Sequence, residues 1–244
     1  MLRDRRSHTD SSAHPLRNTA APAERLVKLA SPSLLGRRLT VEFIGTFVLV
    51  LTVGLATSSR GAGHLAPLAI GSALMVMVFA GGHISGAHYN PAVSFAMLLA
   101  GKLRPRHAPP YVITQLAAGV LAGLLVRALV GPATRAVLGS DWKILVGEYI
   151  FTAALAYVVL NVTAPQETQG NSFYGLAIGF TVVTGAFAVG GITGGAFNLA
   201  VALGDTITGA LTWTHAWIYL LAGVLGGASG AILYAYVNQP PGDV

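Results

Sequence analysis

The sequence contains no cysteine, so disulfide bonds are excluded and the redox compartment is not indicated. Charged residues are also scarce, at 10% of 244 residues, while 53% are hydrophobic. Between residues 41 and 237 the polar residues interrupt long apolar runs and do not alternate with them. Because a water-soluble surface cannot be built from such a composition, we expect an integral membrane protein that contacts the lipid bilayer.

Six apolar runs are long enough to cross a hydrocarbon core of about 30 Å, which takes roughly 20 helical residues. We expect membrane-spanning helices at 41–59, 65–82, 110–130, 144–162, 173–189 and 214–237. No strand pattern competes with these helices, so the predicted fold class is all-α.

The first forty residues are basic and lack an apolar run, which predicts a disordered tail over 1–40 and no cleavable secretion signal. Lys102, Arg104 and Arg106 add positive charge after the second span. The positive-inside bias therefore predicts cytoplasmic N- and C-termini, in a plasma membrane or bacterial inner membrane. This basic charge requires no nucleic-acid partner, and at most the tail contacts anionic lipid.

Two sequence motifs occur twice at an offset of 108 residues. GHISGAHYNPAV at 82–93 returns as GGITGGAFNLAV at 190–201, and LAIG at 68–71 returns at 176–179. The chain therefore contains an internal duplication, with a first half at 41–130 and a second half at 144–237. An extracellular loop (131–143) connects the halves, and a C-terminal tail (238–244) follows them. Since each half has three spans, an odd number, the halves enter the bilayer from opposite sides as an inverted repeat.

Each half also contains a segment too short to cross the membrane, at 91–99 and at 199–206. We expect two half-helices that stop near the midplane, which lipid tolerates only where the broken backbone lines a water-filled cavity or is buried. Glycines next to these segments predict extended or left-handed backbone. They are Gly81, Gly82, Gly86, Gly190, Gly191, Gly194 and Gly195.

Asn90 and Asn198 directly precede the half-helices, where asparagine is a strong N-cap, and Pro91 suits a first helical turn. Each asparagine can cap its helix and still direct amide N–H donors at a solute. A helix N-terminus carries about half a positive charge, so two of them at the midplane oppose cations and protons but accept the oxygen of a neutral molecule. These features predict a passive pore for small neutral solutes.

These residues resemble the aquaporin and aquaglyceroporin superfamily of major intrinsic proteins, over nearly the whole chain after the basic tail. The resemblance rests on an acid early in the first and fourth spans, Glu42 and Glu148, on HISGAHYNPAV, and on the second Asn-x-Ala motif. It implies a right-handed bundle of six transmembrane helices with two re-entrant half-helices, one pore per subunit, and a homotetramer. It also implies that Glu42 and Glu148 anchor the loops by accepting their backbone N–H groups.

Two residues depart from the family pattern. Leu199 replaces the proline of the second motif, at small expected cost because a first-turn N–H lacks a helical partner in any case. Val201 stands where most relatives have the arginine that narrows the pore and donates hydrogen bonds. The remaining filter positions carry over to Ile70, Ala186 and Gly195, so the resemblance implies a wide, apolar constriction.

Such a constriction makes glycerol, urea, ammonia and undissociated metalloid acids plausible permeants besides water. Another basic residue could instead replace the missing arginine from the extracellular side. The candidates are Arg60, Arg127, Arg135 and Lys143.

The first loop and the vestibules are expected to be lined by His83, Gly86, Ala87, His88 and Gly194. No cysteine or acid accompanies the two histidines, so we expect neither a metal site nor a cofactor. No Ser/His/Asp or metal constellation indicates an enzyme. The alternative is an inverted-repeat secondary transporter, although the midplane charges that ion coupling usually needs are missing.

Overall fold

The computed structural model describes residues 33–239, which form helices and connecting loops without a strand in that range. Six of the helices are long: α2 (Leu34–Ala56), α3 (Ala66–Ser85), α5 (Ala108–Val130), α6 (Asp141–Thr163), α7 (Tyr174–Thr193) and α9 (Ala216–Val237). Two are short: α4 (Pro91–Leu99) and α8 (Leu199–Thr208). Single 3-10 turns lie at η1 (Gly63–Leu65), η2 (Pro105–His107), η3 (Gln166–Thr168) and η4 (Trp213–His215).

All six long helices can cross a bilayer by length and composition, with a mean hydropathy between 1.7 and 2.1 over their most apolar windows. Their outward faces are apolar as well, since Ile113 and Ile232 are 66% and 67% exposed. A surface of this kind is suited to lipid and not to water.

Several helix ends differ from the expected boundaries. α2 begins at Leu34, so Arg37 and Arg38, which we assigned to the tail, lie in its first two turns. Long basic side chains can extend from a helix end to the membrane surface, which allows the helix to start before the apolar run. The other tail residues expected at 1–32, and residues 240–244, lie outside the described range.

The glycine pairs 81–82 and 190–191 also differ from expectation. We expected non-helical backbone there, but α3 and α7 continue through both pairs to Ser85 and Thr193. Within a membrane a helix satisfies its own backbone hydrogen bonds, which outweighs the weak helix propensity of glycine. α4 spans the expected residues 91–99, and α8 ends at Thr208, two residues beyond the expected 206.

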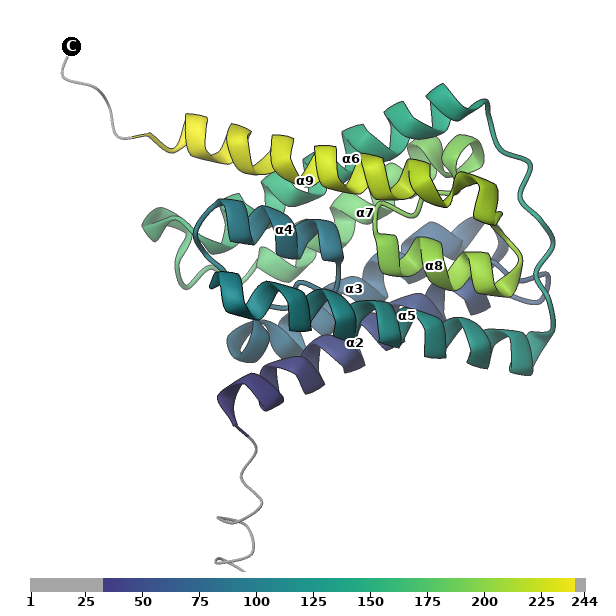
Figure 1. The fold of residues 1–244 in the computed structure, drawn as a ribbon, viewed down its shortest axis with the longest axis horizontal. Coiled ribbons are helices and arrows are strands. Elements are labelled where there is room, and N and C mark those ends of the chain that lie inside the picture. The colour runs from purple at the N-terminus through teal and green to yellow at the C-terminus, as the bar shows by residue number, and fades with distance from the viewer. Residues whose placement is uncertain (1–32, 240–244) are drawn as a thin grey trace, which may run out of the picture. The chain divides into compact units, whose positions relative to one another are not determined.

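The helices pack in pairs that reflect the duplication. α2 packs on α5, α6 on α9, and α3 on α7, while α4 and α8 are enclosed among the long helices (Figure 1). α4 contacts α5, α6 and α9, and α8 contacts α2, α5 and α9. Both half-helices are thus buried in protein, as short helices at membrane depth must be.

Glycines set the closest approaches between helices. A Cβ atom on Gly71 would lie 2.6 Å from the carbonyl oxygen of Gly179, and a Cβ atom on Gly179 would lie 2.5 Å from the carbonyl oxygen of Gly71. These two glycines are the equivalent residues of the repeated LAIG motif. The repeat therefore marks the place where α3 and α7 meet, with backbone against backbone, as small residues permit in membranes.

Candidate functional site

A buried carboxylate holds the loop that precedes α4. Glu42 is fully buried, and its Oε1 accepts hydrogen bonds from Ser85 Oγ at 2.7 Å and from the His88 backbone N–H at 3.0 Å. Its Oε2 accepts from the Tyr89 backbone N–H and from Gln115 Nε2, both at 2.8 Å. Because N–H and C=O point in opposite directions across a peptide plane, the preceding carbonyls face away from Glu42.

The second half repeats this arrangement before α8. Glu148 accepts from Thr193 Oγ1 at 2.7 Å and from the Ala196 backbone N–H at 3.1 Å through Oε1, and from the Phe197 backbone N–H at 2.6 Å through Oε2. The two acids thus occupy equivalent positions and bind equivalent loop residues, an arrangement that stabilises two non-helical segments in the interior.

Left-handed backbone recurs at the same three places in each loop. In the first loop Gly86, Ala87 and Tyr89 have φ of 93°, 51° and 49°; in the second, Gly194, Gly195 and Phe197 have 90°, 66° and 47°. Three of these six residues carry a side chain, and L-residues rarely adopt such angles. The carboxylate hydrogen bonds offset the strain, and the loops hold each asparagine in an extended conformation ahead of its helix.

Asn90 and Asn198 cap their half-helices and connect the two halves. Asn90 Oδ1 accepts from the Ala92 N–H at 2.9 Å, and its Nδ2 donates to the carbonyl of Phe197 at 2.8 Å. Asn198 Oδ1 accepts from the Ala200 N–H at 2.9 Å, and its Nδ2 donates to the carbonyl of Tyr89 at 2.8 Å. Each amide group has a second N–H, which remains available for a solute.

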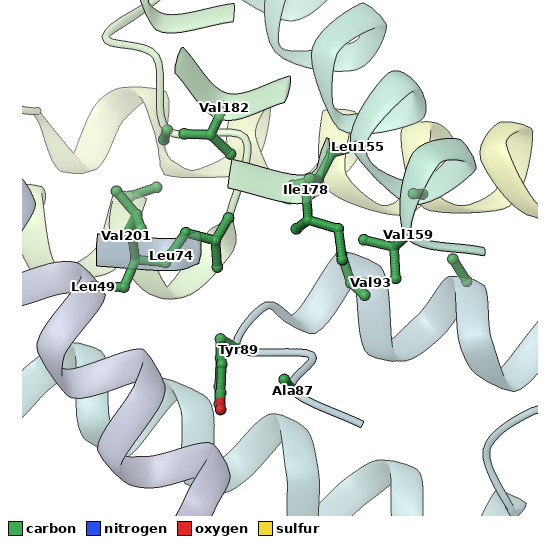
Figure 2. Close-up of a cluster of buried hydrophobic side chains, with 14 of the residues drawn as sticks. Leu49, Leu74, Ala87, Tyr89, Val93, Leu155, Val159, Ile178, Val182 and Val201 are labelled. Carbon is green, nitrogen blue, oxygen red and sulfur yellow. The ribbon is translucent and has the colours of Figure 1, made fainter. Parts of the chain in front are cut away.

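Between the halves lies a narrow cavity of about 20 Å³, which is room for about one water molecule. Asn90 and Asn198 line it. The aliphatic side chains of the lining come from α2, α3, α4, α6, α7 and α8, and several of them, such as Leu49, Val93 and Val201, are labelled in Figure 2. The structure therefore brings both asparagines to the lining of one cavity.

The lining residues of the narrow cavity come in equivalent pairs, with Tyr89 as the one exception among those described. Pairs at the offset of 108 are Ile70 with Ile178, Leu74 with Val182, Ala87 with Gly195, His88 with Ala196, Asn90 with Asn198 and Val93 with Val201. Pairs at the offset of 106 are Leu49 with Leu155 and Val53 with Val159. The duplication thus extends to the individual side chains around the cavity.

A wide cavity of about 660 Å³ opens beyond the narrow one, around the C-terminal ends of α2, α5 and α7. Ile70 and Gly195 line both cavities, Val201 lines the narrow one, and Ala186 lines the wide one. The four expected filter positions are therefore distributed over the two linings, and Ile70 and Gly195 belong to both. None of their side chains can donate or accept a hydrogen bond.

The basic residues considered as replacements for the filter arginine lie elsewhere. Among the described residues that line the two cavities there is no lysine or arginine, so Arg60, Arg127, Arg135 and Lys143 are outside both linings. Arg127 instead donates from Nη1 to the carbonyl of Ile207 at 3.3 Å and is exposed.

The remaining expected lining residues divide into two groups. Ala87 and His88 line the narrow cavity and Gly194 lines the wide one, whereas His83 and Gly86 line neither and are exposed. The His88 ring is 5% exposed, and its Nδ1 lies 3.0 Å from Ser94 Oγ. No cluster of three potential metal ligands occurs among residues 33–239.

One candidate residue, Asp205, was not singled out from the sequence. Asp205 lies on α8, is 7% exposed and lines the wide cavity. A signal was present, because Asn198, Val201 and Asp205 follow the i, i+3, i+7 spacing that places residues on one helix face.

Comparison with known proteins agrees with this arrangement. Residues 67–234 match the family described as "Major intrinsic protein". The chain is 33% identical to "Aquaporin NIP1-4" of Oryza sativa subsp. japonica, over 82% of this chain and 76% of that protein. It is 35% identical to "Glycerol uptake facilitator protein-like 6" of Lactiplantibacillus plantarum, over 85% and 99% respectively. The fold is similar to that of the aquaglyceroporin from Plasmodium falciparum, with a TM-score of 0.70, 23% identity, and coverage of 83% and 96%.

Proposed function

This chain belongs to the major intrinsic protein family and is a passive membrane channel for small neutral solutes, and we propose that its constriction admits solutes larger than water. The observation that carries the proposal is that Ile70 and Gly195 line both cavities, Val201 the narrow one and Ala186 the wide one, and that none of these four residues is charged. We take the part shared by the two cavities, their junction, as the constriction. Glycerol, urea, ammonia and undissociated metalloid acids are the proposed permeants besides water. The relative named as a glycerol uptake facilitator supports this solute class.

Exclusion of cations is proposed to reside at the paired asparagines. α4 and α8 direct their N-terminal ends toward the narrow cavity, and each end carries about half a positive charge. A cation there would lose its hydration shell in a space of about 20 Å³ and meet two positive helix ends. A neutral molecule can instead accept the free N–H of Asn90 and then that of Asn198.

We also propose that both termini face the cytoplasm of a plasma membrane or bacterial inner membrane. Arg37 and Arg38 lie at the start of α2, and the wide cavity is lined by Val53 and Gly54 at the other end of that helix. The positive-inside bias then directs the wide cavity outward. A homotetramer with one pore per subunit is the proposed assembly.

The test is a permeability panel on proteoliposomes that contain wild-type protein or Val201→Arg. The wild type should pass water, glycerol and urea, with flux linear in the gradient. Arginine at position 201 should reduce glycerol permeability about tenfold or more relative to water, because it narrows the junction and places a charge there. Val201→Leu adds bulk without charge and is the matched control. Unchanged selectivity in Val201→Arg would place the constriction elsewhere, and saturable, ion-coupled uptake would indicate a transporter.

A further inference from the structure

The wide cavity contains a carboxylate that has no partner in the described structure. Asp205 is more than nine-tenths buried, and besides the hydrogen bonds within α8 its main-chain carbonyl accepts from Thr208 Oγ1 and from the backbone N–H groups of Gly209 and Leu211. Its side-chain oxygens receive no hydrogen bond from residues 33–239. A buried carboxylate without a protein partner is costly, so its oxygens favour a hydrogen-bond donor in the wide cavity, either water or a solute.

The position of Asp205 relates it to the constriction. It is one turn beyond Val201 on the same face of α8, which is about 6 Å along the helix axis. The half-helix therefore presents Asn198, then Val201, then Asp205 along the direction that leads from the narrow cavity into the wide one. Asp205, Ile70 and Gly195 line the same cavity, so a solute that approaches the constriction passes a space that Asp205 faces.

We propose that Asp205 is a specificity-determining residue that binds solutes carrying two or more O–H or N–H donors, such as polyols and urea, at the entrance of the constriction. This inference rests on the proposed function, since it assumes that such solutes enter the junction. A carboxylate accepts hydrogen bonds and donates none, so it selects for donor-rich molecules and against anions. His64 is the one other ionisable residue in the described lining of the wide cavity, and it is exposed.

The duplication shows that this acid is a feature of one entrance only. The equivalent residue in the first half is Met97, which is 8% exposed and lines neither cavity. A structural role shared by both half-helices would not need a carboxylate at this position. The carboxylate therefore has no counterpart in the first half of the chain, and it lies in the lining of the wide cavity.

The test compares pairs of solutes of similar shape that differ in one donor group. Urea and acetamide differ by an amide NH2 in place of a methyl group, and glycerol and 1,2-propanediol differ by one hydroxyl. Proteoliposomes would contain wild type, Asp205→Leu, Asp205→Asn, or the control Thr206→Val, which alters the adjacent buried residue of α8 outside both cavity linings. Water permeability is measured on the same vesicles.

Asp205→Leu should lower the urea-to-acetamide and glycerol-to-propanediol permeability ratios about tenfold. The reason is that the loss of one hydrogen bond to a charged group changes an equilibrium constant about tenfold or more. Asp205→Asn keeps the shape and one acceptor oxygen, and should lower both ratios roughly threefold. Water permeability should stay within about a factor of two of the wild type in both variants, because a single water molecule does not need two acceptors.

Three results would overturn the inference. Ratios that stay unchanged in both variants would show that Asp205 does not select solutes. An equal loss for all solutes and water, shared with Thr206→Val, would show a role in holding α8 only. Wild-type vesicles that pass water but neither glycerol nor urea would refute the wide constriction itself, and the assumption behind this inference with it.

Discussion

Replacing Gly119 by alanine should close the narrow cavity from a position that does not line it. Gly119 on α5 lies against the carbonyl group of Ala200 in the first turn of α8. A Cβ atom there would be 2.5 Å from that oxygen and 3.2 Å from its carbon, whereas ordinary contact begins near 3.4 Å. Because both neighbours are backbone atoms, no side chain can rotate away, and the two helices must separate by about 0.9 Å.

That displacement acts on the residues of the pore. Ala200 lies between Asn198 and Val201, both of which line the narrow cavity of about 20 Å³. Movement of the first turn of α8 also changes the 2.8 Å hydrogen bond from Asn198 Nδ2 to the Tyr89 carbonyl. Over-packing of this kind costs about 1–3 kcal/mol, and if the barrier to water rises by as much, water permeability falls about tenfold or more.

The assay is stopped-flow light scattering on proteoliposomes with matched protein content. Gly223→Ala is the control, because its Cβ would lie 3.7 Å from Ala92 Cβ, an ordinary contact, and it should leave permeability unchanged. Gly227 is equivalent to Gly119, and a Cβ atom on it would lie 2.7 Å from the carbonyl oxygen of Ala92. Gly227→Ala should therefore also reduce water permeability. If Gly119→Ala conducts as well as Gly223→Ala, the half-helices are not held in place by these contacts.

Two further predictions concern the second loop and its half-helix. Glu148→Gln replaces one acceptor oxygen by an NH2 group, so a loop N–H such as that of Phe197 loses its partner at a cost of about 1–3 kcal/mol. The thermal unfolding midpoint of this variant in detergent should therefore fall, and its permeability to all solutes should fall by the same factor. The control is Glu167→Gln, which changes an exposed acid. An equal unfolding midpoint in both variants would contradict the anchoring role of Glu148. Leu199→Pro should change the unfolding free energy by less than about 1 kcal/mol, because Asn198 already has the extended φ of −157° that a following proline requires. A loss of water permeability in that variant would show that the Leu199 side chain or N–H is needed.

The predicted family and fold class are confirmed, and the duplicated sequence explains why they could be predicted. An offset of 108 residues identifies equivalent positions, and an asparagine before each short segment specifies a helix start, so α4 was predicted to the residue. Offsets alone do not show which face of a helix lines a cavity. For that reason Asp205 was not identified as a lining residue of the wide cavity from the sequence.

Backbone conformation was predictable only in part. Glycine permits left-handed angles but does not require them, so the helical pair Gly190 and Gly191 could not be distinguished from Gly194 and Gly195 by residue type. Conversely, Tyr89 and Phe197 adopt left-handed angles that their side chains disfavour. They do so because Glu42 and Glu148 accept their N–H groups, a tertiary cause that local sequence does not contain.

The distribution of equivalent residues separates conduction from selectivity. Around the narrow cavity, equivalent residues of the two halves line the same space, and most of the pairs are aliphatic in both halves. Asp205 differs in chemistry from its equivalent residue Met97, so we expect it to add a selection by hydrogen-bond donors to the selection by size at the constriction. Substitutions at paired positions such as Val93 and Val201 should therefore alter the passage of every solute, with a larger effect on larger ones. Substitutions at Asp205 should alter which solutes enter while water passage is retained.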